Sequence, residues 1–248
     1  MQDDAATERT NGSPKFRAVI LDYGQVLAAH PTAKEFARMA EMFNVDFDLF
    51  YQLWDASRGP YDHGDFTAEE YWLKLAAQTN TSLDREQIEI LREVEIEIWA
   101  HPVPAMLDWV RQLYAAGITT ALLSNMPSDL VTHLRTNCEW MGNFAFKTFS
   151  SEVRLIKPDP AIYEHTLHGL GVLAPEALFV DDRETNIRAA RALGIHAIQF
   201  RSVAQLKHDL EVLGFRILPV DAELSAAVSD AASPANRTGQ EGKFSPSL

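Results

Sequence analysis

Short apolar runs alternate along this chain with segments of helical periodicity, and this alternation restricts the possible folds more than any other feature. Each run is long enough for one strand, and helical patterns separate most of them. Such a succession predicts an α/β fold class with a doubly wound parallel sheet, because parallel neighbours need a crossover connection. The predicted strands are residues 16–22, 119–124, 146–150, 177–180 and 196–200.

Three segments next to these strands carry helical signals. Residues 104–116 place apolar side chains three and four positions apart, as on one face of a helix. Asp159 and Pro160 suit the cap and the first position of a helix that continues over residues 161–170. Residues 184–193 also gather their apolar side chains on one side, so crossover helices are expected in all three places.

The interval from Pro31 to His101 interrupts the alternation. Thr67 and Glu70 form a potential capping box at the start of a helix. Residues 85–99 suit another helix, although residues 94–98 alternate in a way that would also suit a strand. This interval, called the helical insert below, predicts a helical subdomain placed after the first strand.

The two ends differ in composition from the rest of the chain. The first segment is polar, and the last is rich in Ala, Ser, Pro and Gly. Neither can bury enough apolar surface to offset the entropy of ordering, so we expect disorder in both. The predicted division is a tail at 1–15, a core at 16–30 and 102–220, the helical insert at 31–101 and a second tail at 221–248.

Charge and composition argue against several classes of protein. The formal net charge of -13 disfavours nucleic-acid binding through a broad basic face. No apolar run approaches the roughly 18 residues of a membrane-spanning helix, and residues 1–15 lack the pattern of a signal peptide. Cys138 is the single cysteine, so no intrachain disulfide is expected, which fits a cytoplasmic location. No sequence feature indicates an oligomeric state.

Polar residues follow the predicted strands, at the edge where ligands bind in such sheets. Asp22 closes the first run, where a carboxylate suits a nucleophile or a metal ligand better than core packing. Gly24 allows a tight turn that leaves its carbonyl accessible. Ser124 and Asn125 follow the second run, where a hydroxyl and a backbone N–H can donate to a phosphate oxygen. Taken singly, a capping or turn aspartate explains Asp22 equally well, and an ordinary loop serine explains Ser124 better than a functional role does.

Two further charged positions complete the set. Lys157 lies beside prolines and could neutralise a phosphoryl group, although a lone lysine is usually a solvated surface residue. Asp181 and Asp182 follow the fourth run, and adjacent carboxylates repel each other unless a cation lies between them and Asp22. Oxygen ligands of this kind suit Mg²⁺. A capping role explains one aspartate better than two.

The combined set resembles the four motifs of the haloacid dehalogenase-like (HAD) superfamily. The motif residues here are Asp22, Ser124, Lys157, Asp181 and Asp182. The resemblance covers about residues 16–213 and implies a Rossmann-like core. The helical insert resembles the cap of the subgroup that contains small-molecule phosphatases and dehalogenases, and residues 61–67 (YDHGDFT) resemble a segment of such caps.

The resemblance implies Mg²⁺-dependent hydrolysis of a small phosphorylated metabolite, of the sugar phosphate or nucleotide class. Asp22 would attack phosphorus in line and form an aspartyl-phosphate, which water then hydrolyses. Mg²⁺ would be held by Asp22, the Gly24 carbonyl and Asp182, with Asp181 contributing directly or through water.

The same resemblance assigns the contacts to the phosphoryl oxygens. Ser124, the Asn125 backbone N–H and Lys157 would hold these oxygens, and Asn186 would orient the acidic loop. The cap would close over the site and select the leaving group.

Within the helical insert, Arg58 is the preferred candidate for contact with a second anionic group of the substrate. Trp54, Tyr61 and Trp72 could touch the leaving group, but aromatic residues of small helices usually belong to the core. The sequence identifies no single substrate.

One position departs from the pattern of the family's phosphatases. Most have a second aspartate, two residues after the nucleophile, that acts as general acid and base, and Gly24 stands there in this chain. The enzyme could use good leaving groups, take an acid from the insert, or have lost activity. Asp62 and His63 are the candidates for such an acid, although a role as a turn residue explains His63 better. A missing general acid typically lowers the rate about 10²–10⁴-fold.

Three other functions remain open from the sequence. A haloacid dehalogenase would also use Asp22, but without a metal, and would leave the Asp181–Asp182 pair without a cation. A phosphonate-cleaving enzyme would need a lysine in the insert, where only Lys34 and Lys74 occur. A non-catalytic binding or regulatory module is supported by Gly24 alone.

Overall fold

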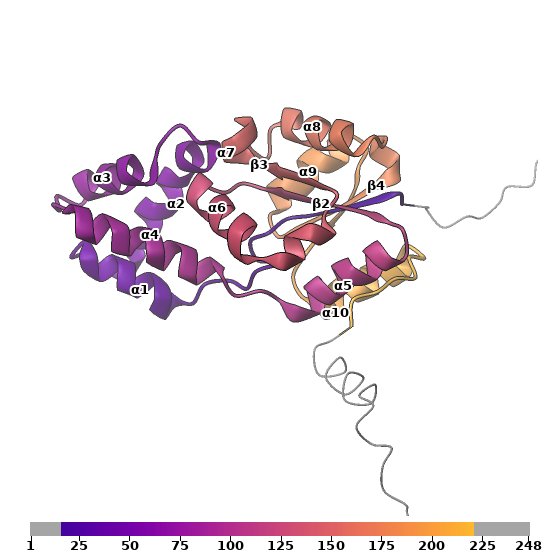
Figure 1. Cartoon of the computed structure of the whole chain (residues 1–248), viewed down its shortest axis with the longest axis horizontal. Helices are drawn as coiled ribbons and strands as arrows, with labels where there is room; N and C mark the ends of the chain where they lie inside the picture. The colour runs from indigo at the N-terminus through magenta and orange to yellow at the C-terminus, as the bar shows by residue number, and fades with distance from the viewer. Residues whose placement is uncertain (1–15, 221–248) are drawn as a thin grey trace, which may run out of the picture.

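A computed structural model describes residues 16–220, which contain a single five-stranded sheet with strand order β3-β2-β1-β4-β5 (Figure 1). All neighbouring strands are parallel, as the alternation predicts. The strands are β1 (Ala18–Leu21), β2 (Thr119–Ser124), β3 (Phe146–Phe149), β4 (Ala177–Asp181) and β5 (His196–Gln199). Their carboxyl ends therefore meet at one edge of the sheet.

Helices cover both faces of this sheet. They are α5 (Pro104–Ala115), α6 (Ser128–Asn137), α8 (Pro160–Leu170), α9 (Glu184–Ala192) and α10 (Val203–Val212), with the short elements η1 (Glu139–Asn143), α7 (Ser150–Val153) and η2 (Ala174–Glu176). Successive side chains of a strand point to opposite faces. Val19 and Leu21 accordingly pack with α5, α6 and α10, whereas Ile20 packs with α8 and α9. The core is a three-layer α/β/α arrangement, with α8 and α9 above the sheet and α5 and α10 below it in Figure 1.

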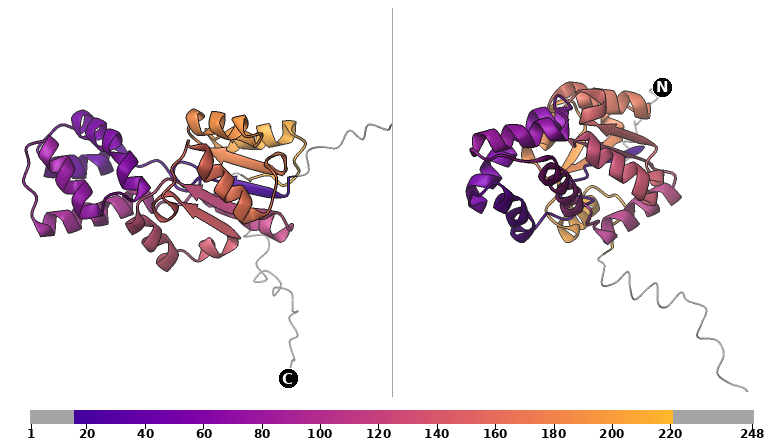
Figure 2. Two further views of the ribbon diagram at one scale, coloured as in Figure 1. Left: turned by 90° about the horizontal axis from the view of Figure 1, so that it is seen from above. Right: turned by 60° about the vertical axis from the view of Figure 1, so that its left-hand side comes forward.

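Four helices follow β1 and pack around a hydrophobic cluster of their own. They are α1 (Ala33–Met42), α2 (Phe47–His63), α3 (Ala68–Gln78) and α4 (Arg85–Trp99). Thr67 and Glu70 form the capping box that the sequence predicts at the start of α3. The strand alternative for residues 94–98 is wrong, because these residues continue α4. Figure 2 shows the four helices as a lobe beside the sheet.

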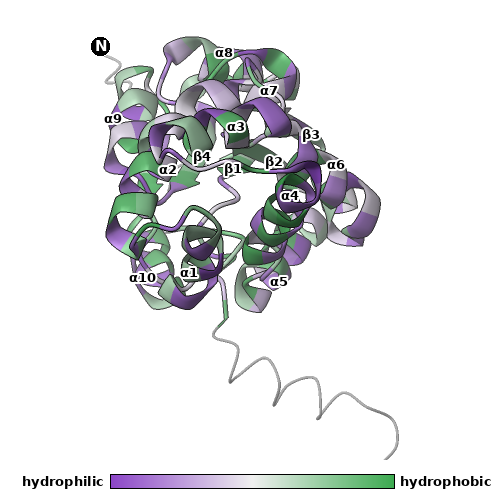
Figure 3. Cartoon of the chain, turned by 90° about the vertical axis from the view of Figure 1, so that its left-hand side faces the viewer, coloured by the Kyte–Doolittle hydropathy of each residue, from purple (hydrophilic) through white to green (hydrophobic). Residues whose placement is uncertain are grey.

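Two adjacent chain segments join this lobe to the core. The Ala29 N–H donates to the His101 carbonyl at 2.7 Å, and the Val103 N–H donates to the Leu27 carbonyl at 2.8 Å. This pairing places the lobe at the edge where the strands end. Figure 3 looks onto that end, with α1–α4 grouped around the ends of the strands.

Most predicted boundaries of individual strands and helices agree with the structure to within a few residues. Asp159 caps α8 and Pro160 opens it, as the sequence predicts. The two tails predicted to be disordered lie outside the described residues. Within residues 16–220, none of the helices is both long and apolar enough to cross a membrane.

Candidate functional site

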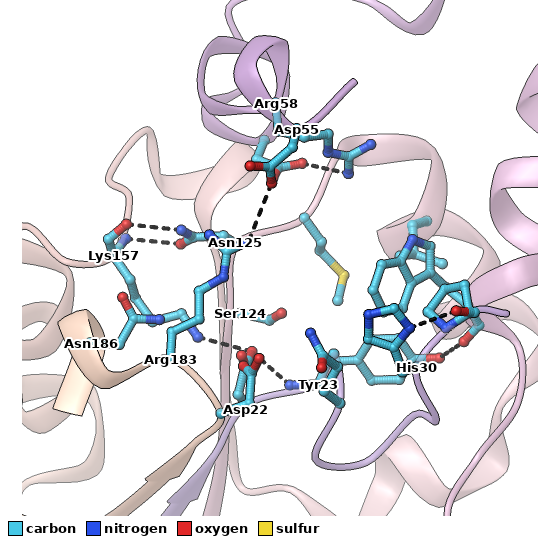
Figure 4. A pocket seen from close by; sticks show the side chains of 18 of the residues that line it. Asp22, Tyr23, His30, Asp55, Arg58, Ser124, Asn125, Lys157, Arg183 and Asn186 are labelled. Atoms are coloured by element: carbon cyan, nitrogen blue, oxygen red, sulfur yellow. Dashed lines mark hydrogen bonds and ion pairs between the residues drawn. The ribbon is translucent and has the colours of Figure 1, made fainter. Parts of the chain in front are cut away.

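A pocket of about 300 Å³ lies between the carboxyl edge of the sheet and the helical insert (Figure 4). Residues from the β1 loop, the ends of β2 and β4, the Lys157 loop and helix α2 line it. The predicted site residues in this lining are Asp22, Gly24, Arg58, Ser124, Asn125, Lys157 and Asp182. Parallel strands explain the convergence, because they bring segments far apart in the sequence to one edge.

Lys157 connects the acidic residues of the pocket. Its Nζ lies 2.9 Å from Asp22 Oδ1 and 2.7 Å from Asp181 Oδ2, and it donates to the Leu123 carbonyl at 3.0 Å. The residue is 4% exposed, so its charge depends on these partners. Burial alone would lower the pKa of Lys157, but the carboxylates of Asp181 and Asp22 raise it above its ordinary value. The residue is therefore a buried ammonium at neutral pH and not a solvated surface lysine.

Asp22 lies in a strongly acidic environment. Burial raises its pKa to about 7, Lys157 opposes that rise, and the nearby Asp181 and Asp182 add to it. The Tyr23 backbone N–H donates to Asp22 Oδ1 at 2.7 Å, which fixes the orientation of the carboxylate. One carboxylate oxygen from each of the three aspartates lies within 4.8 Å of the others. A divalent cation among them would offset this repulsion, so the donor set fits Mg²⁺.

The two aspartates after β4 have different surroundings. Asp181 is fully buried, and its oxygens accept hydrogen bonds from Lys157 Nζ, the Asn186 side chain and the Arg183 backbone N–H. Asp182 lines the pocket and is only partly buried. Burial and the neighbouring Asp181 raise the pKa of Asp182. Asp182 is thus better placed than Asp181 for direct contact with a cation.

Asn125 holds the Lys157 loop against the end of β2. Its side-chain amide donates to the Lys157 carbonyl at 2.9 Å, and its side-chain oxygen accepts from the Lys157 N–H at 2.8 Å. These two bonds leave its backbone N–H as the group that could contact a phosphate. Ser124 is buried beside it and lines the pocket.

Arg58 lies on the opposite wall, on α2, with its charge already paired. It contacts Asp62 at 2.7 Å and also forms an ion pair with Glu95, and its guanidinium lies 4.8 Å from the Trp54 ring centroid. Glu95 was not among the sequence candidates. The signal for it is its place on the face of α4 that buries Leu91 and Ile98, where a carboxylate needs a partner.

The remaining candidates from the insert separate into two groups. Asp62 and Trp54 line the pocket. His63 instead contacts Asp65 at 2.9 Å and the Arg154 carbonyl at 2.8 Å, outside the pocket lining. Tyr61 and Trp72 lie in the hydrophobic cluster of the insert, the core interpretation that the sequence analysis preferred for its aromatic residues.

Two features of the pocket were missed by the sequence analysis. Arg183 pairs with Asp55 of α2 at 3.6 Å, across the gap between the core and the insert (Figure 4). Trp99, at the end of α4, packs over Gly24. A Cβ at position 24 would lie 3.4 and 3.7 Å from two atoms of its indole ring. The space beside Gly24, where a family general acid would stand, is therefore bounded by an aromatic ring.

This packing predicts a size limit at position 24. Gly24→Ala should change the free energy of unfolding by less than about 1 kcal/mol, because its Cβ would make only ordinary van der Waals contact. Gly24→Asp should cost about 1–3 kcal/mol, because a larger side chain beside the Trp99 ring must either shift the ring or take a less favourable rotamer. Urea unfolding measures both. In a double-mutant cycle with Trp99→Leu, the cost of Gly24→Asp should fall, and an unchanged cost would contradict the contact.

Residues 6–194, more than half of the chain, match a family model for haloacid dehalogenase-like hydrolases. A sesquiterpene phosphatase, astK of Aspergillus oryzae, is 34% identical over 98 residues, which cover 38% of this chain and 48% of that protein. A phosphoglycolate phosphatase of Aliivibrio fischeri is 31% identical over 98 residues, which cover 40% and 43%. The chain thus spans about half or less of the length of these relatives.

Solved structures share the architecture. A HAD-family enzyme from Bacteroides thetaiotaomicron, in complex with magnesium and inorganic phosphate, has a TM-score of 0.62 at 20% identity, covering 75% of this chain and 94% of that chain. L-2-haloacid dehalogenase from Xanthobacter autotrophicus, with chloropropionic acid covalently bound, has a TM-score of 0.57 at 19% identity, covering 82% and 85%. At these identities the likeness supports the fold alone.

Proposed function

Because this chain belongs to the haloacid dehalogenase-like hydrolase family, we propose that it is a Mg²⁺-dependent phosphatase. Its substrate is a small phosphorylated metabolite, and the reaction passes through an aspartyl-phosphate on Asp22. The observation that carries this proposal is the convergence of carboxylate oxygens from Asp22, Asp181 and Asp182 within 4.8 Å. A dehalogenase needs no metal and would gain nothing from such a cluster. The phosphatases among the sequence relatives point the same way.

Each residue of the pocket has a role in this reaction. The Asp22 carboxylate attacks phosphorus, and covalent capture divides one difficult displacement into two easier ones. Lys157 and Ser124 bind the phosphoryl oxygens, with the Asn125 backbone N–H beside them. Asp22, the Gly24 carbonyl and Asp182 would hold Mg²⁺, which neutralises charge between the nucleophile and the anionic substrate. Asp181 keeps Lys157 in position and would add its negative charge beside the cation.

Two other functions have less support. Cleavage of a phosphonate through a Schiff base would need a lysine of the insert in the pocket. Among the described residues that line the pocket, neither Lys34 nor Lys74 occurs, and Lys74 lies over the ring of Phe66. A non-catalytic module would not need a buried lysine between two acids.

Hydrolysis of para-nitrophenyl phosphate tests the proposed function, because its good leaving group needs little protonation. Turnover should require Mg²⁺ and stop on addition of EDTA. Chloride release from 2-chloropropionate, measured in parallel, should stay at the blank. Halide release without phosphatase activity would favour the dehalogenase, and a folded protein inactive in both assays would favour the non-catalytic module.

Asp62 is the proposed source of the proton that Gly24 cannot supply. It lines the pocket, and burial raises its pKa although Arg58 opposes the rise, so its protonated form is more accessible than that of a solvated aspartate. Asp62→Asn should lower kcat on an alkyl phosphate by about 10²-fold or more. The same variant should change kcat on para-nitrophenyl phosphate far less.

His63→Ala is the control for this prediction, because His63 neighbours Asp62 but lies outside the pocket lining. It should leave both rates near those of the wild type. Equal loss on both substrates in Asp62→Asn would indicate that Asp62 only holds Arg58 in place.

A further inference from the structure

Part of the pocket lining is aromatic and comes from the helical insert; this part is called the aromatic wall below. Phe36 of α1 and Tyr51 and Trp54 of α2 line it, and Trp99 extends it from the end of α4. Phe36 packs against Tyr51 and Trp54 with ring centroids 5.2 and 4.9 Å away. Because these rings support one another, the aromatic wall is a fixed and largely apolar part of the lining, in which Phe36 and Trp54 are themselves mostly buried.

The permanent cations that line the pocket, among the described residues, all face carboxylates. Lys157 lies between Asp22 and Asp181, Arg58 contacts Asp62 and Glu95, and Arg183 pairs with Asp55. The Arg58 and Arg183 pairs belong to the part of the pocket built with α2 (Figure 4). A second anionic group of a substrate at Arg58 would have to displace Asp62, and one at Arg183 would lie beside the carboxylate of Asp55, which repels it. Paired cations of this kind bind an added anion poorly.

The size of the pocket adds a third constraint. A volume of about 300 Å³ lies at the lower end of the range for small-molecule sites. Part of that volume must hold the phosphoryl group itself. The remaining space accommodates one ring or a short hydrocarbon better than a nucleoside.

On the premise of the proposed phosphatase activity, we propose that the substrate is a monophosphate ester of a small, neutral, apolar alcohol. The phosphate is its single anionic group, and the aromatic wall contacts its hydrocarbon part. This assignment replaces the sugar phosphate or nucleotide class expected from the sequence. It also removes Arg58 as a binding group for a second anion, because Asp62 and Glu95 already occupy it.

Matched substrates test this assignment. Benzyl phosphate and 4-carboxybenzyl phosphate have nearly the same leaving group and differ by one remote negative charge. We expect kcat/KM to be about tenfold higher or more for benzyl phosphate, and glucose 6-phosphate to be as poor as the carboxylated ester. Equal kcat/KM for benzyl phosphate and either competitor would overturn the assignment. Para-nitrophenyl phosphate distinguishes the two proposals. If the protein does not hydrolyse it in the presence of Mg²⁺, the phosphatase activity itself is contradicted, and not only the substrate class.

Asp55→Asn tests the charge argument by a gain of function. It releases Arg183 from its carboxylate partner, so the ratio of kcat/KM for 4-carboxybenzyl over benzyl phosphate should rise several-fold. Asp48→Asn is the matched control, since it makes the same change at an exposed position on α2 outside the pocket lining. An unchanged ratio in Asp55→Asn would overturn the conclusion that paired cations exclude a second anion.

Discussion

Asp22→Asn is expected to abolish turnover while leaving the metal-free protein at least as stable as the wild type. Loss of the nucleophile should lower kcat by about 10⁴-fold or more, because no other group can form the covalent intermediate. The stability of the metal-free protein should not fall with the activity. The Asp22 carboxylate is buried near two other carboxylates, and an amide of the same shape carries no charge to bury.

The stability difference between Asp22→Asn and the wild type should depend on pH, and the raised pKa of Asp22 determines the direction of the change. Burial raises the pKa of Asp22 from 3.8 in the unfolded reference to about 7 in the folded protein. The folded state therefore holds this proton more tightly, and ionisation costs stability increasingly as the pH rises from about 4 to about 7. Asn has no such cost. The stability advantage of Asp22→Asn should thus be absent near pH 4 and complete above pH 7.

Urea unfolding in EDTA across this pH range measures the effect. Asp48→Asn, an exposed change of the same kind, should show no such trend. Addition of Mg²⁺ should raise the Tm of the wild type and raise that of Asp22→Asn less, because one ligand is lost. A variant less stable than the wild type at pH 8 would mean that the bond to Lys157 outweighs the cost of burying the charge.

The core could be predicted from the sequence because its signal is local. Each strand is an apolar run, and each crossover helix has its own period and caps, as Asp159 and Pro160 show for α8. The ambiguity over residues 94–98 arose because an alternating run fits a strand when it is considered alone. Burial of Leu91, Val94 and Ile98 on one face resolves it in favour of a helix.

The acidic half of the site was predictable for a related reason. Parallel strands end at one edge, so polar residues after separate strands must converge there. No comparable rule predicts which residues of the insert contact which residues of the core. The contacts of Arg183 with Asp55 and of Trp99 with Gly24 depend on how the insert lies over the sheet, which no local period encodes. The turn role that the sequence favours for His63 agrees with its contacts to Asp65 and the Arg154 carbonyl, whereas the adjacent Asp62 points into the pocket, because neighbouring residues of a helix point in different directions.

Lys157→Met should have the largest effect on stability of any change in the pocket. The substitution keeps much of the apolar stem but removes the ammonium between Asp22 and Asp181, which lie 2.9 and 2.7 Å from it. Two buried carboxylates then lose their common partner, and breaking a buried pair in this way costs about 3–5 kcal/mol. We expect a loss of this size in urea unfolding at pH 8 in EDTA. Lys207→Met, at an exposed position on α10, should change little.

A second substitution separates the loss of charge pairing from a loss of packing. If the cost arises from the uncompensated carboxylate of Asp181, Asp181→Asn in the Lys157→Met background should recover part of the stability, although alone it destabilises. A cavity or a strained side chain would give additive losses instead.

Mg²⁺ should also restore part of the stability of Lys157→Met, since it neutralises the same carboxylates from the pocket side. Turnover of the folded variant with Mg²⁺ should nevertheless remain lower by about 10²–10³-fold, because the cation cannot take the place of the ammonium that stabilises the phosphoryl oxygens. Full activity in a folded Lys157→Met protein would leave Lys157 a structural role alone.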